Sequence, residues 1–334
     1  MGGIADVAKR AGVSKATASR ALTGAGYVSP TTRQKVVSAA RELGYVASTS
    51  AVSLATGRTR NVGVIMPYVN RWFFAEVLEG IQRSLLERDL DLTLYDAKPG
   101  TVGRQRIFDD YLARKRFDGL IAVGLEPADH EIERMHAIDR PVVMIVGDEG
   151  TTCTVGIDDD HAVRRATEHL IGLGHTDIAF LGGGGADWAM VDRRRLSGYE
   201  AAMAEAGLAD RAQHVQSEVT LPGGYAAAAD LLGDTRRPTA VVGVCDEVAI
   251  GAMIAARRLG IRVPSELSVV GIDDHEFAEM FSLTTLEQIP REQGSAAVDL
   301  LLQQIAQPDR PPVDVRLKAR LVVRASTAPP DTRA

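Results

Sequence analysis

The chain of 334 residues has little cysteine and no long apolar run. Its two cysteines, Cys153 and Cys245, lie far apart and form no C-x-x-C pair, which argues against a disulfide framework and a zinc-finger site. No stretch of about 18 apolar residues occurs, and no apolar segment follows a basic N-terminus, so neither a membrane span nor a signal peptide is predicted. These absences favour a cytoplasmic protein.

Negative charge is scarce in the first 60 residues, where Asp6 and Glu42 are the acidic side chains. The same segment contains nine lysines and arginines and has a net charge of +7. Because the whole chain carries a formal charge of −6, the remainder carries −13. A basic N-terminal segment on an acidic body predicts that the segment binds a polyanion.

The N-terminal segment contains three helical patterns. Residues 4–11 place apolar side chains at helical spacing, and Gly12 stands where a left-handed residue ends a helix. Ser14 is positioned to cap a second helix, and Ser29 followed by Pro30 begins a third. Two helices separated by a glycine turn form a helix-turn-helix, and the third helix completes a small core.

The second helix of this segment combines an apolar stripe with polar side chains. It has the width of the DNA major groove and carries donors that base edges and phosphates accept. An amphipathic helix pair on any protein surface has a similar pattern, but the N-terminal position and the positive charge favour DNA binding. The side chains on its other faces are Lys15, Ala16, Ser19 and Arg20.

After residue 60 the chain alternates apolar runs with helical patterns. The runs "NVGVIMP", "DGLIAVG", "PVVMIVG", "DIAFLGG" and "LSVVGIDD" are typical of parallel strands that helices cover on both faces. The sequence therefore predicts an α/β body, in which ligands bind beyond the carboxyl ends of the strands.

The body lacks the local motifs of common enzymes. The run "LGGGGADW" contains neither a P-loop nor a G-x-G-x-x-G, and His130 and His136 are six positions apart, which misses the spacing of a zinc helix. The acidic segments "IDDDH" and "IDDHE" either coordinate a cation or provide carboxylates in a ligand cleft. We expect no enzymatic activity, no cofactor and no metal site.

Several segments resemble one protein family. "IADVAKRAGVSKATASRAL", "VSPTTRQKV" and "ELGYV" are similar to the DNA-binding head of the LacI/GalR (lactose repressor) family of bacterial transcription regulators. The resemblance continues through "RTRNVGVIMP", "EHLIGLGHTDIAFLGG", "VVGVCDEVAIGAM", "RVPSELSVVGIDD" and "LVVRAST". It implies an all-α helix-turn-helix head and an α/β, two-lobed, periplasmic-binding-protein-like (type I) body with parallel sheets. The implied boundaries are 1–46 for the head, 47–60 for a hinge, and 61–334 for the body, with lobe one at about 61–158 and 287–316 and lobe two at about 159–286 and 317–330.

The resemblance also implies which residues of the head contact operator DNA. Lys15, Ala16 and Arg20 are expected to face base edges, where Ala16 has only a methyl group to offer a thymine methyl. The residues expected to hold phosphates are Ser14, Thr17, Ser19 and Tyr27.

In the hinge, the resemblance implies that Leu54 enters the minor groove, with Ala51 one turn before it. Ala47 and Ser48 replace the proline and asparagine that are usual in the family. Serine still caps a helix, so the hinge assignment is retained.

An effector cleft between the lobes is a further implication. Arg195 and Asp273 are expected to face each other across it and to bind vicinal hydroxyls of a sugar. Without the resemblance, Arg195 is interpreted as a solvated arginine at a helix start and Asp273 as part of a turn at a strand end. Trp72, Phe73 and Phe74 are expected to form an apolar wall, with one or two of them in the core.

The expected cleft departs from the family pattern at three positions. Val146, Val219 and Cys245 replace aspartate, an aromatic residue and asparagine, respectively, and Asp246 follows the last of these. Trp188 is either a substitute stacking surface or a buried structural residue. A less polar cleft favours a large or sparsely hydroxylated sugar or oligosaccharide, with a nucleoside as the alternative.

These features together predict a repressor that binds a pseudo-palindromic operator as a homodimer under the control of a small-molecule effector. No leucine heptads follow "LVVRAST", so the tetramer extension found in some family members is not expected. The sign of control, induction or corepression, stays open. The rival interpretations are an enzyme with a DNA-binding head and a purely architectural DNA binder.

Overall fold

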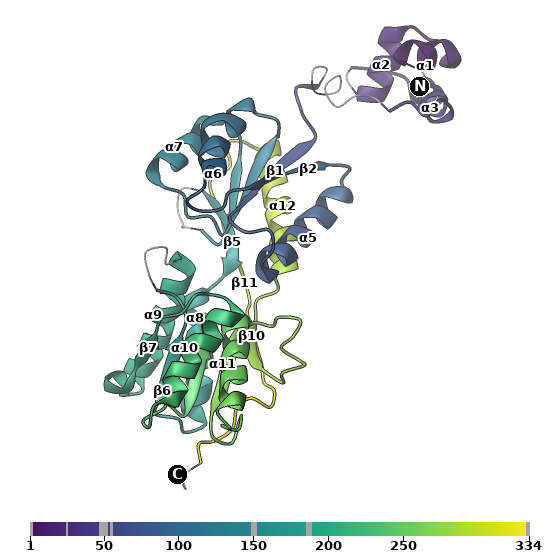
Figure 1. The fold of residues 1–334 in the computed structure, drawn as a ribbon. Coiled ribbons are helices and arrows are strands. Elements are labelled where there is room, and N and C mark those ends of the chain that lie inside the picture. Colours follow the sequence, from purple (N-terminus) through teal and green to yellow (C-terminus); the bar gives the residue numbers. More distant parts are fainter. Residues whose placement is uncertain are drawn as a thin grey trace.

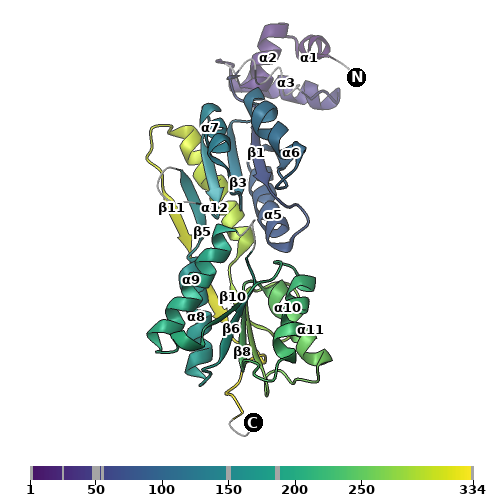
Figure 2. The same cartoon turned by 60° about the vertical axis from the view of Figure 1, so that its left-hand side comes forward.

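The computed structural model describes residues 3–24, 26–46, 53, 56–147, 152–184 and 189–331. It consists of a helical head and a body of two lobes, each built on one six-stranded sheet (Figure 1). The head, lobe one and lobe two follow one another in a row, with lobe one in the middle (Figure 2).

The head contains α1 (Ile4–Ala11), α2 (Lys15–Thr23) and α3 (Pro30–Glu42), as the sequence predicts. Gly12 ends α1 at φ 67°, and the Ser14 Oγ caps α2 by accepting the backbone N–H of Thr17 at 3.1 Å. The three helices bury a small shared core, which consists of Val7, Ala8, Ala18, Ala21, Val36, Ala39 and Ala40.

Lobe one is built on a parallel sheet with the strand order β11-β5-β4-β3-β1-β2. Every residue of β3 and β5 is buried, which explains the uninterrupted apolar runs in the sequence. The strands are β1 (Asn61–Met66), β2 (Asp91–Asp96), β3 (Gly119–Val123), β4 (Val142–Ile145), β5 (Cys153–Ile157) and β11 (Asp314–Leu317).

Helices cover both faces of this sheet. α5 (Trp72–Leu86) and α12 (Pro290–Ala306) pack together on one face, and they approach closely because Gly80 and Gly294 lie at their contact. A Cβ on Gly80 would lie 2.1 Å from the Arg291 carbonyl oxygen, so only glycine fits. On the other face lie α6 (Val102–Arg106), two short turns, η1 (Ile107–Tyr111) and η2 (Leu112–Arg114), and α7 (Asp129–Ala137).

Lobe two has the strand order β12-β10-β9-β8-β6-β7. All of its pairs are parallel except β10 with β12, so the expectation of parallel sheets holds for all but this edge strand. The strands are β6 (Ile178–Leu181), β7 (Gln213–Val215), β8 (Ala240–Gly243), β9 (Ser268–Asp273), β10 (Thr284–Glu287) and β12 (Arg320–Val322). The helices are α8 (Asp159–Gly172) and α9 (Met190–Glu205), which pack together, α10 (Leu221–Gly233) and α11 (Asp246–Arg258), which also pack together, and the short η3 (Ala209–Arg211).

Within the described residues, the chain passes between the lobes three times, from β5 to α8, from β10 to α12, and from β11 to β12. The first two crossings leave from the carboxyl ends of parallel strands, so the carboxyl ends of both sheets point toward the junction of the lobes. Ligand sites of open α/β sheets occur at these ends. No helix in the described part of the chain is long and apolar enough to span a membrane.

Candidate DNA interface and effector cavity

The outer face of α2 carries the residues that the sequence assigns to base contacts. Lys15, Ala16 and Arg20 are exposed, and the Arg20 Nε donates to the Ala16 carbonyl oxygen at 3.3 Å. Tyr27 is 88% exposed, which is unusual for an aromatic side chain. A positive, exposed helix face with an adjacent exposed tyrosine has the chemistry of a DNA-reading surface.

The residues expected to hold phosphates differ in their surroundings. The Ser14 and Thr17 hydroxyls are hydrogen-bonded to each other at 2.9 Å at the N-terminus of α2, where backbone N–H groups also favour an anion. Ser19 is half-buried, and its carbonyl oxygen accepts the Thr23 hydroxyl at 2.9 Å. The hinge residues Ala47, Ser48, Ala51 and Leu54 lie outside the described residues.

A cavity of about 520 Å³ lies at the junction of the lobes, where the carboxyl ends of the sheets meet. Both lobes line it. Its lining includes eight of the expected effector residues, namely Trp72, Phe73, Phe74, Val146, Arg195, Val219, Cys245 and Asp273. Trp188 lies outside the described residues.

Aromatic side chains form the lobe-one wall of this cavity. Trp72 lies across the junction from His275 of lobe two, with ring centroids 4.8 Å apart. Phe73 and Phe74 meet edge to face at 5.5 Å and also pack against the lobe-one core. The wall is therefore partly core, and Trp72 is the aromatic residue that contacts the opposite lobe.

Arg195 is buried in lobe two and hydrogen-bonded within that lobe. Its Nε and Nη2 donate to Asp159 Oδ1 at 2.9 and 2.8 Å, and its Nη1 donates to the Val244 carbonyl oxygen at 2.8 Å. Asp273 belongs to the same lobe, so the expectation that Arg195 and Asp273 face each other across the cleft is wrong. The tertiary partner of Arg195 is Asp159, which is 36 positions away and has no sequence motif that links the two.

Asp273 ends β9 in an unusual backbone conformation, with φ at 142°. Its Oδ1 accepts a hydrogen bond from the Gln288 amide, and burial raises the pKa of its carboxyl group, with Asp246 nearby adding to the effect. A non-glycine residue in this region is strained, and such strain is concentrated at ligand sites.

Asp246 does not line the cavity, so the effector contact expected for it is wrong. Its carboxylate is fully buried, where Oδ1 accepts the Thr285 hydroxyl at 2.6 Å and Oδ2 accepts the His275 backbone N–H at 2.8 Å. Burial raises its pKa to about 7. Asp246 therefore connects α11 to the segment after β9 and to β10.

Four charged residues of the lining, Arg71, Asp192, Glu218 and Glu247, were not predicted from the sequence. Asp192 and Glu247 stand in the first turns of α9 and α11, and Arg71 stacks on the Tyr68 ring at 3.8 Å. Burial raises the pKa of Asp192 to about 6 and also raises that of Glu247. One signal was present, because Asp192 lies three residues before Arg195 and so shares its helix face.

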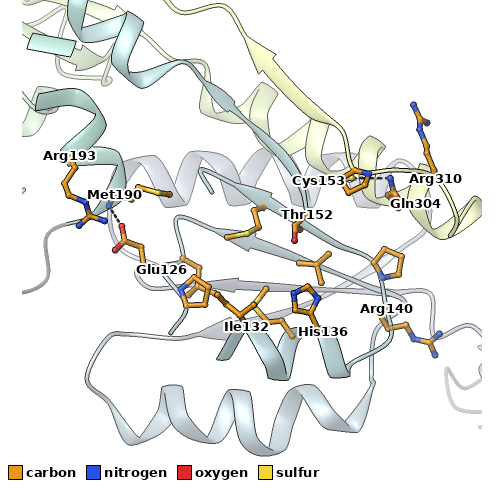
Figure 3. A pocket seen from close by; sticks show the side chains of 17 residues that line it. Glu126, Ile132, His136, Arg140, Thr152, Cys153, Met190, Arg193, Gln304 and Arg310 are labelled. Atoms are coloured by element: carbon orange, nitrogen blue, oxygen red, sulfur yellow. Dashed lines mark hydrogen bonds between the residues drawn. The ribbon is translucent and has the colours of Figure 1, made fainter. Parts of the chain in front are cut away.

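A second cavity, of about 480 Å³, lies mainly against lobe one and extends to the start of α9 (Figure 3). At one end Glu126 of lobe one is directed toward Met190 and Arg193 of lobe two, and its carboxylate accepts the Met190 backbone N–H. Arg140 and Arg310 lie at the other end. A carboxylate at a helix N-terminus is favourable, so this bond connects the two lobes in the described conformation.

A helix-turn-helix head with an exposed second helix, joined to a two-lobed body with an inter-lobe cavity, defines a DNA-binding transcriptional regulator. Residues 3–48 match the family model described as "Bacterial regulatory proteins, lacI family", and residues 167–327 match the model of a periplasmic binding protein-like domain. The chain belongs to the lacI family of bacterial regulatory proteins.

Individual relatives and solved structures are similar to this chain over nearly its whole length. The chain is 34% identical over 335 residues to the HTH-type transcriptional repressor PurR of Vibrio campbellii, covering 97% of this chain and 98% of that protein. The structure of the lac repressor dimer bound to operator and the anti-inducer ONPF has a TM-score of 0.86 at 28% identity, covering 98% and 99%. A complex of the transcriptional regulator CelR with cellobiose has a TM-score of 0.72 at 29% identity, covering 98% and 100%.

Proposed function

We propose that this protein is a repressor that binds a pseudo-palindromic operator as a homodimer and is controlled by a carbohydrate effector. The observation that carries the proposal is the combination of an exposed, basic α2 face with a cavity lined by both lobes of the body. One head reads only a short half-site, so a twofold operator requires two heads related by twofold symmetry. The similarity to a repressor dimer bound to operator supports this arrangement.

Within this proposal, Lys15, Ala16 and Arg20 contact base edges. The phosphate contacts come from Ser14, Thr17, Ser19 and Tyr27. Residues 47–60 act as a hinge between head and body, in which Leu54, preceded by Ala51, enters the minor groove. An inserted leucine unstacks a base step at a cost of a few kcal/mol, which the additional contacts on bent DNA offset.

The lining of the inter-lobe cavity supports a carbohydrate. Its volume of about 520 Å³ is within the usual range of small-molecule sites. Trp72 and the adjacent phenylalanines offer the apolar surface on which a sugar ring packs, and Asp273 and Asp192 offer acceptors for its hydroxyls. Cellobiose in the related CelR complex agrees with this ligand class. A nucleoside is the alternative. It is disfavoured because Val219 replaces the aromatic residue on which a base would stack.

Effector control follows from the position of the cavity. A ligand there contacts Trp72 of lobe one and Asp192 of lobe two, so it has different affinities for open and closed arrangements of the lobes. The ligand can change DNA affinity only by as much as its own affinities for the open and closed arrangements differ. Both an inducer and a corepressor are compatible with this coupling.

The test uses the full-length protein. An operator is selected from random DNA, and its affinity is measured by fluorescence anisotropy with and without members of a panel of sugars, oligosaccharides and nucleosides. We expect two protein chains per operator by sedimentation and a shift in affinity with at least one carbohydrate. A single chain on the operator would exclude the dimer, and a response to nucleosides alone would exclude the carbohydrate.

A further inference from the structure

The polar lining of the inter-lobe cavity contains more carboxylates than cations. Among the described lining residues, the cations are Arg71 and Arg195, and Arg195 is already paired with Asp159 behind the wall. The lining carboxylates are Asp192, Glu218, Glu247 and Asp273. The cavity therefore presents an excess of negative charge to a ligand.

Asp192 is the carboxylate that most needs a ligand. Its side chain lies in the lining and only 7% of the residue is exposed, yet no hydrogen bond reaches its carboxylate in the described part of the chain. The buried Asp246, in contrast, accepts two hydrogen bonds, and Asp273 accepts one. Among the described residues, the Ser217 Oγ in the same lining is buried and has no hydrogen-bond partner. Buried polar groups are normally satisfied, so these two groups indicate the place of ligand donors.

The chain's own carboxylates occupy the positions where an anionic ligand would bind. α9 and α11 begin at the cavity, and a helix N-terminus ordinarily favours a phosphate or a carboxylate. Here the first turns carry Asp192 in α9, and Asp246 and Glu247 in α11. Burial raises the pKa of Asp192 and of Glu247, although Arg71 lowers both, so the nearby cations do not offset the burial of these groups.

We propose that the effector carries a protonated amine that Asp192 and Glu247 receive, as in an amino sugar or a glucosamine oligosaccharide. The ammonium group donates charge-assisted hydrogen bonds to Asp192, while the sugar ring packs against Trp72 on the opposite wall. Sugar phosphates and uronic acids are rejected by the same carboxylates. This inference rests on the proposed carbohydrate-responsive function and narrows its ligand class.

The test compares three disaccharides of one skeleton by calorimetry on the full-length protein. They are cellobiose, the β-1,4-linked glucosamine disaccharide, and its N-acetylated form, in which the positive charge is removed. We expect the free amine to bind at least about tenfold more tightly than the two neutral sugars, as a charge-assisted hydrogen bond predicts.

Charge-removing variants locate the effect. Asp192→Asn and Glu247→Gln are each expected to weaken binding of the amine about tenfold more than binding of cellobiose, because the amide oxygen still accepts a hydroxyl hydrogen bond but the charge is gone. Glu200→Gln, an exposed substitution on the same helix α9, is the matched control and leaves both affinities unchanged.

The outcomes separate this inference from the proposed function. If cellobiose binds as tightly as the amine, the amine assignment is overturned while the carbohydrate function stands. If Asp192→Asn weakens both ligands equally, the residue shapes the cavity and does not select charge, which also overturns the assignment. If none of the three sugars binds and the panel yields a neutral or anionic carbohydrate effector, the amine assignment is overturned while the carbohydrate function stands. If the panel yields nucleosides alone, both fall.

Discussion

The buried charge of Asp192 lowers the free energy of unfolding, and a single substitution is expected to restore it. In the unfolded chain its carboxyl group has the ordinary pKa of 3.8, whereas burial in the folded protein raises the pKa to about 6. A raised pKa means that the folded state binds the proton more tightly than the unfolded state. Ionisation of Asp192 therefore destabilises the fold by up to about 3 kcal/mol above pH 6, and this cost disappears as the pH falls toward 4.

Asp192→Asn keeps the shape of the side chain and removes its charge. We expect urea unfolding at pH 7.5 to show the variant more stable than the wild type by up to about 3 kcal/mol, because asparagine resembles the protonated carboxyl group. At pH 4.5 the difference shrinks to less than half of this value. Glu200→Gln on the exposed face of α9 is the matched charge-removing control on the same helix. A variant that is less stable than wild type at pH 7.5, or a difference that is the same at both pH values, would refute the reasoning.

Four further predictions concern other parts of the molecule. Arg20→Ala is expected to cost about 1 to 3 kcal/mol of operator affinity and to relax preference at one base pair; an unchanged selection profile contradicts this. Leu54→Ala should weaken specific binding more than nonspecific binding in the same anisotropy assay, and equal losses count against insertion. Gly294→Ala places a methyl group about 2.4 Å from a carbonyl oxygen of α5, so thermal unfolding should report a loss of about 1 to 3 kcal/mol, whereas Gly233→Ala, which meets no atoms, is the control. Glu126→Gln removes the charge that accepts the Met190 backbone N–H at the N-terminus of α9 and so weakens a contact between the lobes. Calorimetry should show effector binding weakened about two- to fivefold. Tighter binding would show that this contact does not favour the ligand-bound arrangement of the lobes.

Local sequence accounts for the head. Gly12 ends α1 and Ser14 caps α2 because a left-handed residue and a side-chain acceptor act on backbone groups within a few positions. The exposed faces of Lys15 and Arg20 follow from the same helical period. Such features depend on neighbours in the chain, so periodicity and capping residues are enough to predict them.

The α/β class of the body could also be predicted, because strands buried on both faces read as continuous apolar runs. The runs that become β3 and β5 are buried over their whole length. The apolar runs do not reveal the order of the strands in the sheets. In the part of the chain that the structure describes, the two sheets, the three crossings between lobes and the antiparallel edge strand depend on packing between segments far apart in the sequence.

The residues around the inter-lobe cavity were predicted only in part from the sequence. Sequence and family resemblance placed Arg195 and Asp273 in the lining, but the pairing of Arg195 with Asp159 and the burial of Asp246 beneath the wall were decided by the tertiary structure. Adjacent residues at the start of a helix point in different directions, so Glu247 reaches the cavity while its neighbour Asp246 does not. Capping and periodicity act over a few residues and can be read from the chain, whereas the pairing and ionisation of a buried carboxylate depend on desolvation by distant segments, which only the folded structure brings together.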